Sequence, residues 1–121
     1  MYTISVETHF WALHQLRLAD GSNEPTHGHN WAVTAQVSAK RLDSMGLAID
    51  FGRIRVLLNR IIAQLHNESL EKLDYFRRNN PSAENVAKYV FDQLRPQLPK
   101  YLKLDFVQVA EHPGCAAKYA P

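Results

Sequence analysis

Two stretches near the start of the chain alternate hydrophobic and polar residues with the period of a β-strand. From Ile4 to Leu16 the even-numbered positions are mostly apolar and the odd-numbered ones mostly polar. From Asn30 to Ala39 the apolar residues fall on the odd-numbered positions instead. Turn-forming residues separate the two stretches, in the run Asp20-Gly21-Ser22-Asn23-Glu24-Pro25. The pattern predicts two amphipathic strands that can pair as a hairpin.

Two helices are predicted after the second strand. Apolar residues recur with the 3.6-residue period of a helix after Asp50, which is placed to cap the first turn. A second periodic stretch follows Ser82, another candidate cap, and Pro96 and Pro99 end it. The two apolar stripes contain Ile54, Leu57, Leu58, Ile61, Ile62 and Leu65 in the first helix, and Val86, Ala87, Val90, Phe91 and Leu94 in the second.

The last part of the chain predicts two more strands. The first contains Leu102, Leu104, Phe106, Val107 and Val109, changes its buried face, and ends at Glu111. A weaker pattern indicates a short final strand through Lys118 and Tyr119. Helices grouped between two pairs of strands indicate an α+β domain over residues 1–121, an antiparallel four-stranded sheet with two helices on one face. Because such a sheet has open edges, we expect its strands to pair across subunits.

The composition narrows the class of protein. The chain has 121 residues, of which 45% are hydrophobic and 21% charged, and its formal net charge is +2. This length suits a single domain, and the small charge without long basic runs predicts neither a nucleic-acid nor a membrane partner. No stretch resembles a signal peptide or a membrane span. Because Cys115 is the single cysteine, the chain cannot form an intrachain disulfide, and we expect a cytoplasmic protein. Free cysteines usually behave as small apolar residues, so we expect the Cys115 thiol to be buried.

Three of the six histidines fall on the apolar sides of the first two predicted strands. His14 lies on that side of the first strand, and His27 and His29 lie on that side of the second. Alternate strand residues point to the same face about 7 Å apart, so His27 and His29 can hold one ion, with His14 opposite them in a hairpin. Three histidines leave one position of a tetrahedral zinc ion open, which is typical of catalytic zinc.

Other features of this region allow an alternative. Gly28 has no side chain, which is consistent with a backbone crowded by a ligand or a metal. Each of the three histidines taken alone is also consistent with a hydrogen-bonded core or surface residue that binds nothing. His9 falls on the polar side of the first strand and His112 directly precedes Pro113, so we expect both at the surface.

Several segments, in order along nearly the whole chain, resemble the 6-pyruvoyl-tetrahydropterin synthase family, which includes the 6-carboxy-tetrahydropterin synthases of queuosine biosynthesis. The segment around His14 and the run His27-Gly28-His29-Asn30 are similar to its ligand segments. The segment from Gly46 through Asp50-Phe51 is similar to the family's Gly...Asp-Phe segment. The run Asn80-Pro81-Ser82-Ala83-Glu84-Asn85 is similar to its Asn-Pro-Thr-Ala-Glu-Asn segment. Glu111 fits the glutamate that ends the family's third strand.

The resemblance implies a fold, an assembly and a set of site residues. It implies the tunnelling fold, in which subunits join their sheets into a barrel as homotrimers or homohexamers with active sites between subunits. It also implies Zn²⁺ on His14, His27 and His29, and a pterin held by Glu111 with Ser82 nearby. A carboxylate suits this task, because it accepts two parallel hydrogen bonds from a 2-amino-pyrimidinone edge.

The chain departs from the family pattern at its proton relay. The family commonly has a catalytic cysteine shortly before the His-Gly-His, whereas residues 21–26 contain no thiol. At the positions where the family has an Asp-His pair, this chain has His66-Asn67. One branch of the family has a glutamate near the missing cysteine and makes 6-hydroxymethyl-dihydropterin, and Glu24 invites comparison with it.

The leading hypothesis is a zinc-dependent lyase that acts on the side chain of 7,8-dihydroneopterin triphosphate. Glu24 is the first candidate for the general base, and His66 is the second. Alternatively, Glu24 is a solvated carboxylate of the loop, and His66 is a structural histidine. The product is the pyruvoyl, carboxy or hydroxymethyl pterin, of which Glu24 favours the last, and the pathway is queuosine or folate biosynthesis. A second hypothesis is a zinc- and pterin-binding protein with a degenerate relay, and a third is a structural oligomer whose histidines bind nothing.

Overall fold

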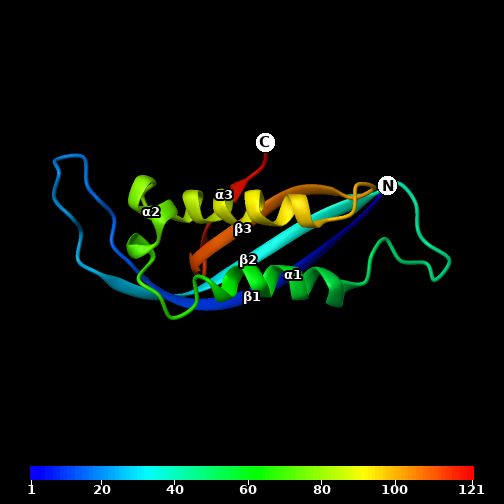
Figure 1. The fold of residues 1–121 in the computed structure, drawn as a ribbon, viewed down its shortest axis with the longest axis horizontal. Helices are drawn as coiled ribbons and strands as arrows, with labels where there is room; N and C mark the ends of the chain where they lie inside the picture. Colours follow the sequence, from blue (N-terminus) through cyan, green and yellow to red (C-terminus); the bar gives the residue numbers. More distant parts are fainter.

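A computed structural model describes residues 1–121 as a four-stranded antiparallel sheet with helices packed on one face (Figure 1). The strands lie in the order β1-β2-β3-β4. Their bounds are Tyr2–His14 for β1, His27–Ala39 for β2, Lys103–His112 for β3 and Cys115–Tyr119 for β4. All helices lie between β2 and β3 in the chain: α1 (Phe51–Ala63), η1 (Leu70–Lys72), α2 (Asp74–Arg78), α3 (Ala83–Leu94) and η2 (Arg95–Gln97). The predicted fold class is confirmed.

The hairpin of β1 and β2 pairs its two strands without a bulge. Its register runs from Tyr2 opposite Ala39 to His14 opposite His27. The strand that we predicted from Ile4 to Leu16 therefore begins two residues earlier and ends at His14. After His14 the chain leaves the sheet, and Leu16 makes its backbone hydrogen bond to Glu24 in the connecting loop instead.

A hydrophobic core fills the space between the sheet and the helices. The two-residue period of the strands sends alternate side chains to the helical side, where Phe10 and Trp31 are fully buried and stack with ring centroids 5.7 Å apart. Phe76 of α2 and Phe91 of α3 are buried from the other side. Burying one such side chain contributes about 1.5 to 3 kcal/mol. This core holds the ends of β1 and β2 in place.

Both predicted helix caps are present. Asp50 Oδ1 accepts a hydrogen bond of 2.6 Å from Gly52 N at the start of α1. Ser82 Oγ accepts one of 3.2 Å from Asn85 N at the start of α3. The structure adds the short helix α2, which the pattern did not predict because five residues are too few to show a 3.6-residue period.

The exposure of Cys115 differs from the expectation. Cys115 is exposed, so the expectation of a buried thiol was wrong. It stands at the first position of β4, directly after the Pro113-Gly114 turn, on a strand at the edge of the sheet. None of the helices has the length and apolar content needed to cross a membrane.

Candidate metal centre and its surroundings

Three imidazole rings converge where β1 ends and β2 begins. The register places His14 directly opposite His27, and the strand period turns His29 to the same face. The ring centroids of His14 lie 4.4 Å from His27 and 5.2 Å from His29, and those of His27 and His29 lie 4.7 Å apart. One ring nitrogen from each residue lies within 4.8 Å of the others. The convergence predicted from strand parity is therefore present.

Backbone carbonyl groups fix the orientation of two of these rings. His14 Nδ1 donates to Pro81 O at 2.7 Å, and His27 Nδ1 donates to Pro25 O at 3.0 Å. A carbonyl oxygen can only accept, so both rings carry a proton on Nδ1. Hydrogen bonds of this kind orient histidines that bind metals through the other ring nitrogen.

The remaining nitrogens of this pair face each other. His14 Nε2 and His27 Nε2 lie 2.8 Å apart. In two neutral rings already protonated on Nδ1, both Nε2 atoms carry bare lone pairs, and these repel each other unless a proton or a metal ion lies between them. His29 Nε2 is buried and has no hydrogen-bond partner. Three ring nitrogens, one from each histidine and within 4.8 Å of one another, fit a divalent metal ion that accepts imidazole ligands, such as zinc.

The environment of His29 disfavours the protonated form of its ring. Burial lowers the pKa of His29 below its ordinary value of 6.5, and the neighbouring rings of His14 and His27 lower the pKa further, while Glu111 acts in the opposite direction. A neutral imidazole is the form that binds a metal. On its inner side the cluster contacts the core, because the Trp31 ring lies 4.8 Å from the His14 ring.

Glu24 lies beside this cluster in the loop between β1 and β2. Its Oε1 atom accepts a hydrogen bond of 3.1 Å from Leu16 N and lies 3.8 Å from His27 Nδ1. The backbone of Glu24 also donates to Leu16 O at 3.0 Å. The loop therefore fixes one oxygen of the carboxylate next to a candidate metal ligand and leaves Oε2 without a hydrogen bond.

Glu111 approaches the cluster from the end of β3. Its Oε2 atom lies 3.8 Å from His29 Nε2. The same side chain lines a small pocket of about 240 Å³ between the start of α3 and β4, together with Cys115. Ser82 does not line that pocket; its hydroxyl oxygen caps α3, and the preceding residue, Pro81, holds His14.

His66 lies apart from the three converging rings. It follows α1 in an exposed segment that runs along the outer edge of β1, where Trp11 N donates to His66 Nδ1 at 3.1 Å and Asn67 N donates to Trp11 O. Its only side-chain hydrogen bond is this one to β1. Within one chain the structure does not bring His66 to the candidate metal centre.

His112 adds a fourth imidazole to the region. Its ring centroid lies 5.9 Å from that of His29, and its side chain is exposed as expected. In the sequence, one feature indicates that His112 lies near the three histidines: it directly follows Glu111 at the end of the same strand. That signal is ambiguous, because the last residue of a strand can turn to either side.

Comparisons with known proteins agree on one family. The model described as 6-pyruvoyl tetrahydropterin synthase matches residues 3–121. A 6-carboxy-5,6,7,8-tetrahydropterin synthase of Rickettsia typhi is 30% identical over 90 residues, which cover 60% of this chain and 64% of that protein. The chain thus spans slightly less than two thirds of that relative.

Solved structures share the fold. The 6-pyruvoyl tetrahydropterin synthase of Caenorhabditis elegans superposes with a TM-score of 0.87 at 21% identity, covering 99% of this chain and 95% of that one. A variant of the Plasmodium vivax 6-pyruvoyltetrahydropterin synthase, in which alanine replaces a catalytic glutamate, gives a TM-score of 0.74 at 18% identity. It covers 98% of this chain and 96% of its own.

Proposed function

The chain belongs to the 6-pyruvoyl tetrahydropterin synthase family, and on this basis we propose that it is a zinc-dependent lyase acting on the side chain of 7,8-dihydroneopterin triphosphate. The observation that carries the proposal is the pair of Nε2 atoms of His14 and His27, 2.8 Å apart, on rings whose protons are held elsewhere by carbonyl groups. Such an arrangement is unfavourable without a cation.

His14, His27 and His29 would hold the zinc ion. When bound, zinc supplies a Lewis acid that lowers the pKa of a hydroxyl group and favours the charge that develops on its oxygen. The backbone carbonyls of Pro81 and Pro25 keep two of the ligand nitrogens unprotonated. Trp31 and the core behind it exclude water from the inner side of the cluster.

Glu24 is our candidate for the base that removes the substrate's proton. Its Oε1 atom is held by Leu16 N, so the proton would be taken by Oε2. The loop holds this carboxylate 3.8 Å from a ring of the candidate metal centre, so it would lie beside a substrate bound there. A catalytic glutamate in the Plasmodium vivax relative supports the choice of residue type.

His66 is the second candidate for the base. Its Nδ1 atom accepts from Trp11 N, so the neutral ring carries its proton on Nε2. His66 would therefore have to give up this hydrogen bond and take the substrate's proton on Nδ1. It lies at the outer edge of β1. Where two subunits pair their sheet edges, His66 would approach the site of a neighbouring subunit rather than its own.

Glu111 is proposed to hold the pterin ring. As a carboxylate it offers two acceptor oxygens to the ring's amino group and adjacent N–H, and such paired charge-assisted hydrogen bonds are strong. Its position 3.8 Å from His29 would present the pterin side chain to the metal centre. Ser82, one residue after the carbonyl group that holds His14, is proposed as a further contact near the substrate.

Assembly into a homotrimer or homohexamer is part of the proposal. In one chain the outer edges of β1 and β4 are the two ends of the sheet. The segment that contains His66 and Asn67 covers the end of β1 near Trp11, whereas the rest of that edge pairs with no other strand. An open edge of this length is usually covered in native proteins, and β4 of another subunit would cover it.

Several products can form from the same substrate side chain, and the identity of the product shows which reaction takes place. Loss of triphosphate with internal redox gives the pyruvoyl compound, and retro-aldol cleavage gives the carboxy or hydroxymethyl compound. Glu24 in place of a thiol favours cleavage to 6-hydroxymethyl-dihydropterin. The alternative proposal is a protein that binds zinc and pterin without turnover, and it is favoured by the altered pair His66-Asn67.

The decisive experiment is incubation with 7,8-dihydroneopterin triphosphate, with and without a chelator, followed by mass identification of the product. The proposal predicts a 6-substituted pterin that no longer forms after chelation and forms again when zinc is restored. Tight pterin binding without loss of substrate over hours would support the binding protein instead. Turnover that persists in the chelated protein would contradict the role of zinc.

A further inference from the structure

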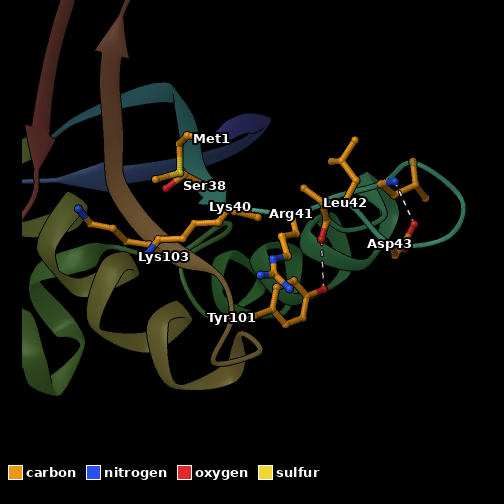
Figure 2. Close-up of a pocket in the computed structure, with 11 residues that line it drawn as sticks. Met1, Ser38, Lys40, Arg41, Leu42, Asp43, Tyr101 and Lys103 are labelled. Atoms are coloured by element: carbon orange, nitrogen blue, oxygen red, sulfur yellow. Dashed lines mark hydrogen bonds between the residues drawn. The ribbon is translucent and has the colours of Figure 1, made fainter.

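A larger cavity opens at the other end of the sheet from the three histidines (Figure 2). Its volume is about 580 Å³, and Met1 and Ala39 line it at the far end of the β1 and β2 pair. The candidate metal centre lies at the opposite end of that pair, at His14 and His27. Tyr2 and His14 are twelve positions apart along β1, which is about 40 Å of extended chain. The two sites are therefore separate.

Hydrogen bonds hold the walls of this cavity in place. The loop between β2 and α1 forms one wall, and Tyr101 before β3 forms another. The hydroxyl group of Tyr101 donates to Ala48 O at 3.1 Å and ties the two walls together. Within the loop, Asp43 Oδ1 accepts from Met45 N and Leu47 N, both at 2.9 Å. A preformed cavity of this volume is typical of sites for small molecules.

The charges that line the cavity are unbalanced. Lys40, Arg41 and Lys103 all line it, and none of them forms an ion pair. The one acidic lining residue is Asp43, and one of its oxygens already accepts two backbone hydrogen bonds. The formal charge of the lining side chains is thus +3 − 1 = +2. A concave site with this surplus attracts anions.

The rest of the lining is apolar and in contact with solvent. Six of the eleven lining residues are hydrophobic. Three of them present large exposed side chains, with exposed fractions of 77% for Met1, 40% for Leu42 and 62% for Tyr101. Figure 2 shows them around the cavity with the three basic side chains. Covering apolar surface of this kind is favourable, so an occupant with an apolar body gains free energy here.

We propose that this cavity is a second binding site, for a small anion with an aromatic body. The aromatic body would contact Met1, Leu42 and Tyr101, and a phosphate or carboxylate group would be held by Arg41, whose side chain lies beside Tyr101 in Figure 2. Arginine is suited to this role because its planar group makes two parallel hydrogen bonds to an oxyanion. The proposal is independent of the chemistry at the three histidines.

The test uses 8-anilinonaphthalene-1-sulfonate, an aromatic anion whose fluorescence rises on binding. We expect one saturable site for each chain in the assembled wild-type protein, and weaker binding of the uncharged N-phenyl-1-naphthylamine. Arg41→Gln should weaken binding of the anion about tenfold, because it removes a charge-assisted contact. Lys103→Gln should weaken it less, because it removes only a more distant positive charge of the lining. Phenyl phosphate and benzoate are then added as competitors. The one that displaces the probe at the lower concentration shows whether the site prefers a phosphate or a carboxylate group.

Two controls separate this site from general effects. Lys100→Gln removes an exposed lysine next to Tyr101 that does not line the cavity, and it should leave the affinity unchanged. His27→Ala should also leave it unchanged, because the metal centre lies at the other end of the sheet. An affinity of the Arg41→Gln variant equal to that of the wild-type protein, or equal binding of the uncharged probe, would overturn the proposal. So would the absence of saturable binding, as when a neighbouring subunit fills the cavity.

Discussion

The indole ring of Trp11 lies directly over Gly28 on the open face of the sheet. A β-carbon added to Gly28 would lie 2.4 Å from Trp11 Cζ2 and 2.9 Å from Leu13 Cδ2. His27 and His29, on either side of Gly28, point to the opposite face, where they meet His14. The backbone at Gly28 is crowded as we expected, but our explanation was wrong: neighbouring side chains of β1 crowd it, not a ligand or a metal.

Gly28→Ala is therefore expected to destabilise the protein by about 1 to 3 kcal/mol, the usual cost of excess volume at a packed position. The free energy of unfolding can be measured by urea titration. The Trp11→Ala variant removes the nearer of the two obstacles, so Gly28→Ala should cost less in that background, where only Leu13 still has to shift. Equal costs in the two backgrounds would mean that the indole ring is not the obstacle.

Glu24→Gln is expected to lower turnover about 100-fold or more, because a positioned base contributes that much to a proton transfer. The glutamine can still accept a hydrogen bond from Leu16 N, so the loop that holds the residue should keep its structure. The measurement is kcat with 7,8-dihydroneopterin triphosphate.

His66→Asn is the matched comparison for Glu24→Gln. Asparagine keeps an acceptor for Trp11 N but has no imidazole to exchange a proton. Zinc content should be unchanged in both variants. If Glu24→Gln keeps wild-type turnover while His66→Asn loses it, the base is His66 and our choice of Glu24 is wrong.

Glu111→Gln is expected to weaken pterin binding at least tenfold while zinc content stays the same. The substitution replaces one acceptor oxygen with a donor, and one of the two parallel hydrogen bonds to the pterin edge is then lost. Isothermal titration with a non-reacting pterin measures the affinity. Loss of zinc together with pterin would show instead that Glu111 supports the metal centre through His29, which lies 3.8 Å away.

Asp50→Ala is expected to reduce the free energy of unfolding by about 1 kcal/mol, the usual contribution of a helix cap. Asp50→Asn keeps an acceptor for Gly52 N and should cost only a few tenths of that value. Urea unfolding of both variants tests whether the hydrogen bond at the start of α1 contributes to stability. Equal losses in the two variants would argue for charge rather than capping.

Strand parity predicted the part of the site that depends only on side-chain direction. A two-residue period sends His14, His27 and His29 to one face once β1 and β2 pair, so the three rings converge by geometry alone. Asp50 and Ser82 were identified for a similar reason, since capping is a local interaction between neighbouring residues. These features require little knowledge of the rest of the chain.

Other features depend on contacts between distant segments, and the sequence pattern did not reveal them. The cavity at Tyr101 forms only when the loop after β2 meets the start of β3. Cys115 was expected to be buried because cysteine usually is, but its burial is decided by which strand lies at the edge of the sheet. The position of His66 at the edge of β1 is likewise a result of tertiary packing.

The metal centre itself is tested most directly by the zinc content of the protein purified without a histidine tag. Elemental analysis by mass spectrometry should give one zinc ion for each chain, and His27→Ala and His29→Ala should each abolish stoichiometric binding. His9→Ala, which removes an exposed histidine outside the cluster, should keep one ion. A wild-type protein without stoichiometric zinc, or full zinc content in the His27 and His29 variants, would contradict the account.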